Sequence, residues 1–166
     1  MQRHREGAVL IAGTPDEVFA FVDDHSRFAS HMSQSSWMMG GGRMLVDVDG
    51  AKGQAVGSHI RLSGKVFGVR LFLDELVTRR SPPTEKVWET VGTPRLLVIG
   101  PYRMGIEIGP ENRGSRLRVF IDYDLPTGWT SWLALLFGGI YAGWCVKQML
   151  AGTSAHFSDH GTVAAA

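Results

Sequence analysis

The chain has 166 residues, of which 44% are hydrophobic and 20% are charged, and its formal net charge is +1. This length allows one domain with a core that is stable without disulfide bonds, and the single cysteine excludes an internal disulfide framework. The balanced charge, without a basic tract, argues against a nucleic-acid partner. Only four apolar residues, Val9–Ala12, follow the charged N-terminus, which is too few for a signal peptide, so we expect a cytoplasmic protein.

The first quarter of the chain predicts a strand and two short helices. The strand is expected at Ala8–Ala12, and Thr14 is a suitable N-cap for a helix that begins with Pro15 and two acidic residues. A second short helix is predicted at Arg27–Met32. The composition of Ser33–Gly42 is that of a loop, although this loop carries large apolar side chains.

From Arg43 onward the apolar residues recur with a period of two, which predicts strands rather than helices. Turns are expected at Pro82-Pro83, at Gly92–Pro94 and at Pro110–Gly114, and a bend is expected at Gly100-Pro101. The predicted strands are Arg43–Asp49, Ser58–Phe67, Val69–Arg80, Glu85–Val91, Arg95–Ile108 and Ser115–Leu125.

The stretch Leu125–Phe157 predicts a long C-terminal helix with no charged residue before Lys147. At helical spacing, its bulky side chains fall on one side, and its small residues, including Ala134, Gly138 and Ala142, fall largely on the other. Such a helix can lie close to a sheet, while its large groups shape a cavity or a contact surface. The order of elements predicts an α+β fold with one antiparallel sheet.

Several stretches resemble the START-like helix-grip (SRPBCC) superfamily, which includes polyketide cyclases and lipid-transfer domains. The stretch Val9–Asp24 is similar to its first strand and capped helix, Gly57–Gly68 and Pro82–Thr90 are similar to its middle strands, and the last strand with the long helix matches its ending. The resemblance implies a curved antiparallel sheet of about seven strands wrapped around the C-terminal helix, two short helices between strands 1 and 2, and a cavity between sheet and helix. One domain is expected to span residues 1–166, with flexible tails at 1–6 and 158–166.

An apolar cavity in this position predicts a binding site for a hydrophobic small molecule, with tyrosine hydroxyls as its few polar anchors. Each candidate residue has an alternative role as ordinary packed core. Trp37 and Met38 are expected at the rim, where their loop either closes the cavity mouth or simply covers the core. The candidates for the cavity wall are Trp88, Tyr102, Met104, Tyr123, Phe137, Tyr141 and Trp144.

The titratable residues give little support for catalysis or metal binding. Glu75 is the one weak catalytic candidate, because it shares strand parity with Leu71, Leu73 and Val77 and a carboxylate facing the cavity could act as a base. His156 and His160 have helical spacing but no third ligand, so neither a metal nor a cofactor is expected. His25 and His31 are expected at the surface of a short helix, and Cys145 as a buried, inert thiol.

Three functions remain in competition. The first is binding of a lipid, an isoprenoid or quinone, or a polyketide-like molecule. The second is an enzyme on the same scaffold, such as a cyclase or dehydratase acting on such a molecule. The third is a peripheral membrane protein that uses the apolar C-terminal helix, whose bulky face could also join two copies into a homodimer.

Overall fold

The structure is a computed structural model that describes residues 2–30, 43–66, 68–126, 128 and 131–163. Its sheet is built from β1 (Arg3–Ile11), β2 (Arg43–Val48), β3 (His59–Val66), β4 (Val69–Ser81), β5 (Glu85–Arg95), β6 (Tyr102–Glu111) and β7 (Gly114–Tyr123). The helices are α1 (Pro15–Asp23), α2 (His25–Phe28) and α4 (Ser131–Val163). The predicted α+β class and order of elements are confirmed.

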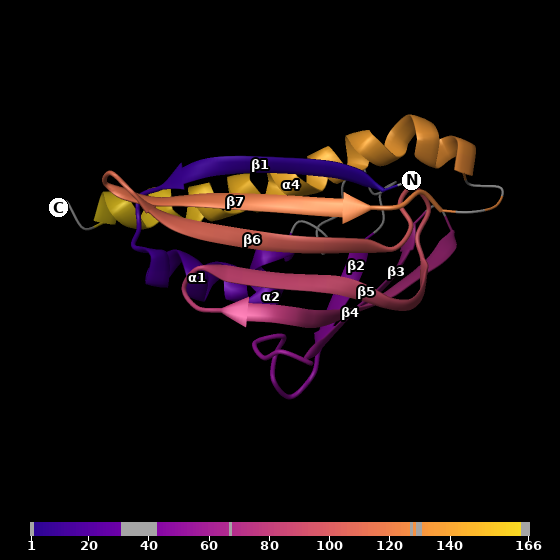
Figure 1. Cartoon of the computed structure of the whole chain (residues 1–166), viewed down its shortest axis with the longest axis horizontal. Coiled ribbons are helices and arrows are strands. Elements are labelled where there is room, and N and C mark those ends of the chain that lie inside the picture. The colour runs from indigo at the N-terminus through magenta and orange to yellow at the C-terminus, as the bar shows by residue number, and fades with distance from the viewer. Residues whose placement is uncertain (1, 31–42, 67, 127, 129–130, 164–166) are drawn as a thin grey trace.

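All neighbouring strands pair antiparallel, in the order β1-β7-β6-β5-β4-β3-β2. Consecutive strands are neighbours except β1, which crosses to the far side of the meander and pairs with β7, so that Arg3 lies opposite Tyr123. The sheet is strongly twisted, with β2 and β3 running steeply across the direction of β6 and β7 (Figure 1). The long helix α4 packs along β1 and β7, which gives the sheet-around-helix arrangement that the resemblance implies.

The start of α1 follows directly from its sequence. Thr14 accepts a hydrogen bond from the backbone N–H of Glu17, and the Glu17 carboxylate accepts one from the backbone N–H of Thr14 in return. This reciprocal capping box satisfies two backbone donors at the helix start. The buried side chains of Val18, Phe19 and Val22 then hold α1 against the core.

Several boundaries differ from the sequence prediction. The helix α2 lies at His25–Phe28 rather than at Arg27–Met32, and the strand predicted at Arg95–Ile108 is β6, which begins only at Tyr102. β1 begins at Arg3 rather than at Ala8, and α4 continues to Val163 rather than ending at Phe157. Gly92–Pro94 lies inside β5, where Gly92 takes a φ of +70° and the pairing of β4 with β5 shifts register between Phe72 and Asp74. The glycine therefore produces a bulge in a continuous strand instead of a turn.

The position of Phe120 breaks the alternation of β7 for a packing reason. Phe120 lies opposite Gly105 of β6, and a Cβ on Gly105 would come within 2.6 Å of the phenyl ring. The ring therefore covers the space left by the absent side chain, and the Arg118 guanidinium lies over it at 5.3 Å from the ring centre. An aromatic residue on the outer face is in this way shielded from water.

Candidate functional site

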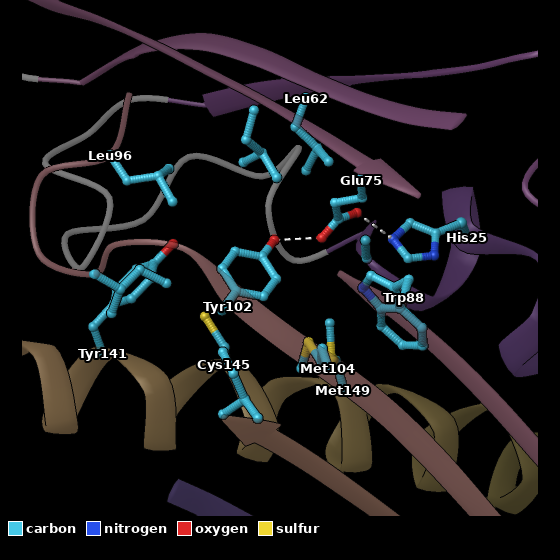
Figure 2. Close-up of a pocket in the computed structure, with 14 residues that line it drawn as sticks. His25, Leu62, Glu75, Trp88, Leu96, Tyr102, Met104, Tyr141, Cys145 and Met149 are labelled. Atoms are coloured by element: carbon cyan, nitrogen blue, oxygen red, sulfur yellow. Dashed lines mark hydrogen bonds and ion pairs between the residues drawn. The ribbon is translucent and has the colours of Figure 1, made fainter. Parts of the chain in front are cut away.

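A cavity lies between the concave face of the sheet and the middle of α4. Its lining residues come from β3 to β7 on one side, from α2 at one end and from α4 on the opposite side, and Figure 2 shows them around the cavity. Most of the lining is apolar and comes from Ala29, Leu62, Leu73, Trp88, Leu96, Ile99, Met104, Ile121 and Met149. The polar groups in the lining are those of His25, Glu75, Tyr102, Tyr141 and Cys145.

The free space in this cavity is small. Its volume is about 30 Å³, counted as the space open to the centre of a water-sized sphere, which admits only a few water molecules. This space by itself is too small for a lipid-sized guest. The reason is that large side chains, among them Trp88, Tyr102 and Met104, fill most of the interior themselves.

Glu75 is the central polar residue of the cavity. It projects from β4 on the same face as Leu73 and Val77, and it is almost completely buried. The Tyr102 hydroxyl on β6 donates a short hydrogen bond to Oε1 of Glu75, and Nε2 of His25 lies 3.4 Å from Oε2 (Figure 2). Three elements that are far apart in sequence thus bring three polar side chains into one buried chain.

The tyrosine in this chain remains a proton donor throughout the ordinary pH range. Burial raises the pKa of Tyr102 well above its usual value, and the neighbouring Glu75 carboxylate raises it further by its charge and by accepting the hydrogen bond. The hydroxyl therefore keeps its proton and points it at Glu75.

His25 enters the cavity because α2 is turned inward. The Asp24 side chain caps α2 by accepting hydrogen bonds from the backbone N–H groups of Ser26 and Arg27, which fixes the first turn. The imidazole then packs edge-on against Trp88, with ring centres 5.1 Å apart, and only 3% of its side-chain surface is exposed. The expectation that His25 lies at the surface is therefore wrong.

Several buried polar atoms at this site lack a hydrogen-bond partner within the described part of the chain. They are Nδ1 of His25, Oε2 of Glu75 and Nε1 of Trp88, together with the Tyr123 hydroxyl outside the cavity. A buried polar atom without a partner costs about 1–3 kcal/mol. Oε2 of Glu75 has the 3.4 Å contact with Nε2 of His25 but no hydrogen bond of good geometry, and Nε1 of Trp88 has none, so an acceptor and a donor are left for a guest.

The cavity wall formed by α4 carries polar groups of low reactivity. Cys145 and Tyr141 interact through a hydrogen bond, and both face the cavity. Burial raises the pKa of the Cys145 thiol to about 12, so the thiolate that a nucleophile needs is absent at neutral pH. Burial likewise raises the pKa of Tyr141 well above its usual value.

The structure brings only part of the predicted binding residues together. Trp88, Tyr102, Met104 and Tyr141 line the cavity, as does the candidate Glu75. Tyr123 is fully buried but is absent from the lining, and Trp144 packs partly buried against the core. Trp37 and Met38 lie outside the described residues.

Phe137 corrects the prediction most clearly, because 48% of its surface is exposed and it lies away from the cavity lining. The small residues of α4 face the protein: a Cβ on Gly138 would come within 2.6 Å of the Val98 carbonyl oxygen. Since this side lies against the domain, the bulky side chains of the first half of α4 point outward.

A second buried polar cluster lies at the end of α1 and was not anticipated. Nζ of Lys86, with no exposed surface, lies 2.9 Å from Oδ1 of Asp23 and donates to the Asp23 backbone carbonyl at 2.9 Å. Arg80 donates to both carboxylate oxygens of Asp23, at 2.8 and 3.2 Å. Burial lowers the pKa of Lys86, although its contacts with Asp23 oppose that effect.

No protein-family model matches the sequence, and no curated protein matches it. The fold has many counterparts among solved structures. The Zhui aromatase/cyclase from Streptomyces sp. R1128 superposes with a TM-score of 0.70 at 14% identity, over 95% of this chain and 94% of that one. Ara h 8.0201 gives a TM-score of 0.62 at 8% identity, over 96% and 99% of the two chains.

A point mutant of norcoclaurine synthase from Thalictrum flavum gives a TM-score of 0.61 at 14% identity, over 97% of each chain. Such low identities establish the fold and leave the activity open. The resemblance found in the sequence is confirmed at that level: the chain has the START-like helix-grip fold.

Proposed function

We propose that the protein binds an apolar small molecule in the cavity between sheet and α4, and that the molecule carries one polar group directed at Glu75. A lipid, an isoprenoid or a polyketide-like compound with a hydroxyl group has this chemistry. The observation that carries the proposal is that Oε2 of Glu75 and Nε1 of Trp88 lack a hydrogen-bond partner among the described residues, in a lining that is mostly apolar. A hydroxyl group can accept from the indole and donate to the carboxylate at the same time.

The small free volume means that the guest must displace side chains as it enters. Met104 and Met149 are suited to this, because an unbranched thioether side chain repacks at low cost. Apolar surface removed from water stabilises the complex by about 25 cal/mol per Å². The fold is shared with an aromatase/cyclase, a protein whose name denotes chemistry on a small molecule, which supports the proposal by analogy.

Native mass spectrometry of freshly purified protein, followed by solvent extraction, tests for a bound molecule. Thermal shifts with a panel of lipids, quinones and aromatic polyketides test binding directly.

We expect Glu75→Gln and Trp88→Phe each to lower the affinity for the best panel compound by about tenfold, since each removes one hydrogen bond to the polar group of that compound. Glu111→Gln, an exposed control on β6, should leave the affinity unchanged. The proposal fails if no mass is retained and no panel compound raises the melting temperature.

Acid–base chemistry on the bound molecule is a second candidate, favoured by the contact of Glu75 with both Tyr102 and His25. A buried carboxylate can take a proton from the guest, and the adjacent imidazole can accept or return one. Incubation with the best panel compound and mass analysis of the products tests this candidate. Conversion by the native protein that Glu75→Gln abolishes, at saturating compound, supports it, whereas unchanged compound leaves binding as the function.

A further inference from the structure

The first half of α4 exposes a continuous apolar surface. This outer apolar face consists of Trp132, Leu135, Leu136, Phe137 and Ile140, each of which is about half exposed or more. The helix contains no charged residue between Ser131 and Lys147. Soluble monomers rarely expose an apolar patch of more than a few hundred Å² unless it contacts a partner or a membrane.

The packing of α4 fixes the direction of this face. Ala134, Gly138 and Ala142 are buried on the opposite side of the helix, and Gly138 lies so close to the Val98 carbonyl that no side chain fits between them. The helix cannot turn its bulky side inward without opening this contact. In Figure 1 the first half of α4 rises beyond β1, at the end of the molecule where the chain begins.

Two arginines border the outer apolar face. Nε of Arg5 donates to the Gly139 carbonyl at 3.4 Å, which places its guanidinium beside Ile140 on the helix. Arg3 shares the helix-facing side of β1 with Arg5, because residues two apart on a strand point the same way. Within the described residues, neither arginine forms an ion pair with a carboxylate.

We propose that the outer apolar face of α4, with Arg3 and Arg5 beside it, docks on the surface of an anionic lipid membrane. Apolar side chains of a helix lying in the interface enter the headgroup and acyl boundary, and a tryptophan such as Trp132 is favoured there. The two guanidinium groups, which have no carboxylate partner among the described residues, supply charge complementarity to anionic headgroups. The helix lies on the bilayer rather than across it, because its other side packs on β1 and β7.

A second copy of the chain fits this surface less well. A two-fold contact through the outer apolar face would enclose the arginines of both copies, with no carboxylate on the described part of the face to pair with them.

The helix also has the length and composition of a membrane span, yet 33% of its most apolar window is buried inside the domain. Insertion of the helix across a bilayer would require this buried part of α4 to separate from the sheet.

Co-sedimentation of the full chain with vesicles tests the proposal. The vesicles contain phosphatidylcholine, with or without about one third of phosphatidylglycerol, a fraction sufficient for a negative surface potential. We expect binding to the anionic vesicles that weakens at high salt. Leu136→Glu with Ile140→Glu should lower the bound fraction at least about tenfold, because two anchoring side chains become charged.

Leu10→Glu with Leu45→Glu is the matched control. It adds the same charge at two leucines outside the outer apolar face, whose side chains are 64% and 68% exposed. It should change binding less than about twofold, as expected for net charge alone. Arg5→Gln should lower binding to anionic vesicles and leave the residual binding to neutral vesicles unchanged. Circular dichroism and melting temperature establish that each variant is folded.

Equal losses in the helix pair and in the control pair would overturn the proposal. So would an absence of vesicle binding together with a dimer that the helix substitutions dissociate, as measured by light scattering; that result would assign the face to a second copy. Retention in vesicles after alkaline carbonate washing would assign a span instead. None of these outcomes depends on whether the cavity holds a guest.

Discussion

Asp23 and His25 are separated by one residue, yet the buried polar clusters that they join are completed differently. The Asp23 carboxylate accepts hydrogen bonds from Arg80 and lies against Lys86. The negative charge of this cluster is therefore paired with positive charges, and its carboxylate oxygens have donors. The His25 cluster, in contrast, leaves atoms of His25, Glu75 and Trp88 without partners among the described residues. The first cluster has the properties of a structural tie, a set of polar contacts that holds α1 against the sheet. The second has the properties of a binding site, because its polar atoms can still form hydrogen bonds with a ligand.

This comparison predicts that the loss of one charge lowers the stability much more in the Asp23 cluster than in the His25 cluster. The largest effect is expected for Asp23→Asn, which leaves Lys86 buried without its counter-charge and should lower the free energy of unfolding by about 3–5 kcal/mol. Urea denaturation measures it, with the surface substitution Asp16→Asn as control. A loss as small as that of the control would mean that the Asp23 cluster is not a structural tie.

The Asp23 cluster should also make the stability of the protein depend on acidic pH. Burial by itself raises the pKa of Asp23, but the hydrogen bonds from Arg80 and Lys86 outweigh burial and hold the pKa below its usual 3.8. Because the pKa is lower in the folded than in the unfolded state, the contribution to stability is complete above the unfolded value and is lost as the pH falls through the folded value. We therefore expect native stability to fall below about pH 4 more steeply than that of Asp23→Asn, in urea titrations at a series of pH values.

Tyr102→Phe should have a smaller effect. It removes one buried hydrogen bond to Glu75 and should cost about 1–2 kcal/mol, measured by urea denaturation. Tyr141→Phe, on the α4 wall, provides the comparison within the same cavity. If the Tyr102 substitution stabilised the protein, the hydroxyl would be another group that lacks compensation in the empty cavity.

Glu75→Gln sharpens the comparison, because it should change the stability by less than about 1 kcal/mol in either direction. The amide oxygen can still accept from Tyr102, and the substitution removes a charge whose second oxygen has no hydrogen-bond partner in the described structure. Thermal and urea unfolding both measure it. A loss comparable to that of Asp23→Asn would show that Glu75 is structurally compensated after all.

The smallest effect concerns Cys145. With a thiol pKa of about 12, it should react with a disulfide reagent at neutral pH only when the protein is unfolded in denaturant. Reaction rates with and without denaturant measure this difference. Rapid labelling of the folded protein would indicate that the α4 wall opens to solvent, and with it the cavity.

Sequence patterns predicted the sheet well because alternation is a local property. The parity of Glu75 with Leu73 and Val77 placed its carboxylate on the concave face, where the structure has it. The two faces of α4 were also recognisable, but a pattern on one element does not say which face the rest of the chain covers. For that reason Phe137 was assigned to the interior although it lies outside.

Residues whose environment depends on distant segments could not be placed in the same way. His25 lies on a helix of four residues, which is too short for a periodic pattern, and its burial depends on Trp88 of β5. Lys86 shares the inner side of β5 with Trp88, against the rule that charges face water, because its partner Asp23 comes from α1. The small volume of the cavity depends on how all of these side chains pack together.

The pairing of β1 with β7 also bears on how the chain is made. Val9 lies opposite Leu117, so β1 finds its partner only after about a hundred further residues have been synthesised. Contacts of such long sequence separation are slow to form, and an unpaired strand edge is exposed to non-native pairing until its partner is present. A chain that ends before β7 therefore leaves β1 without its neighbour in the sheet.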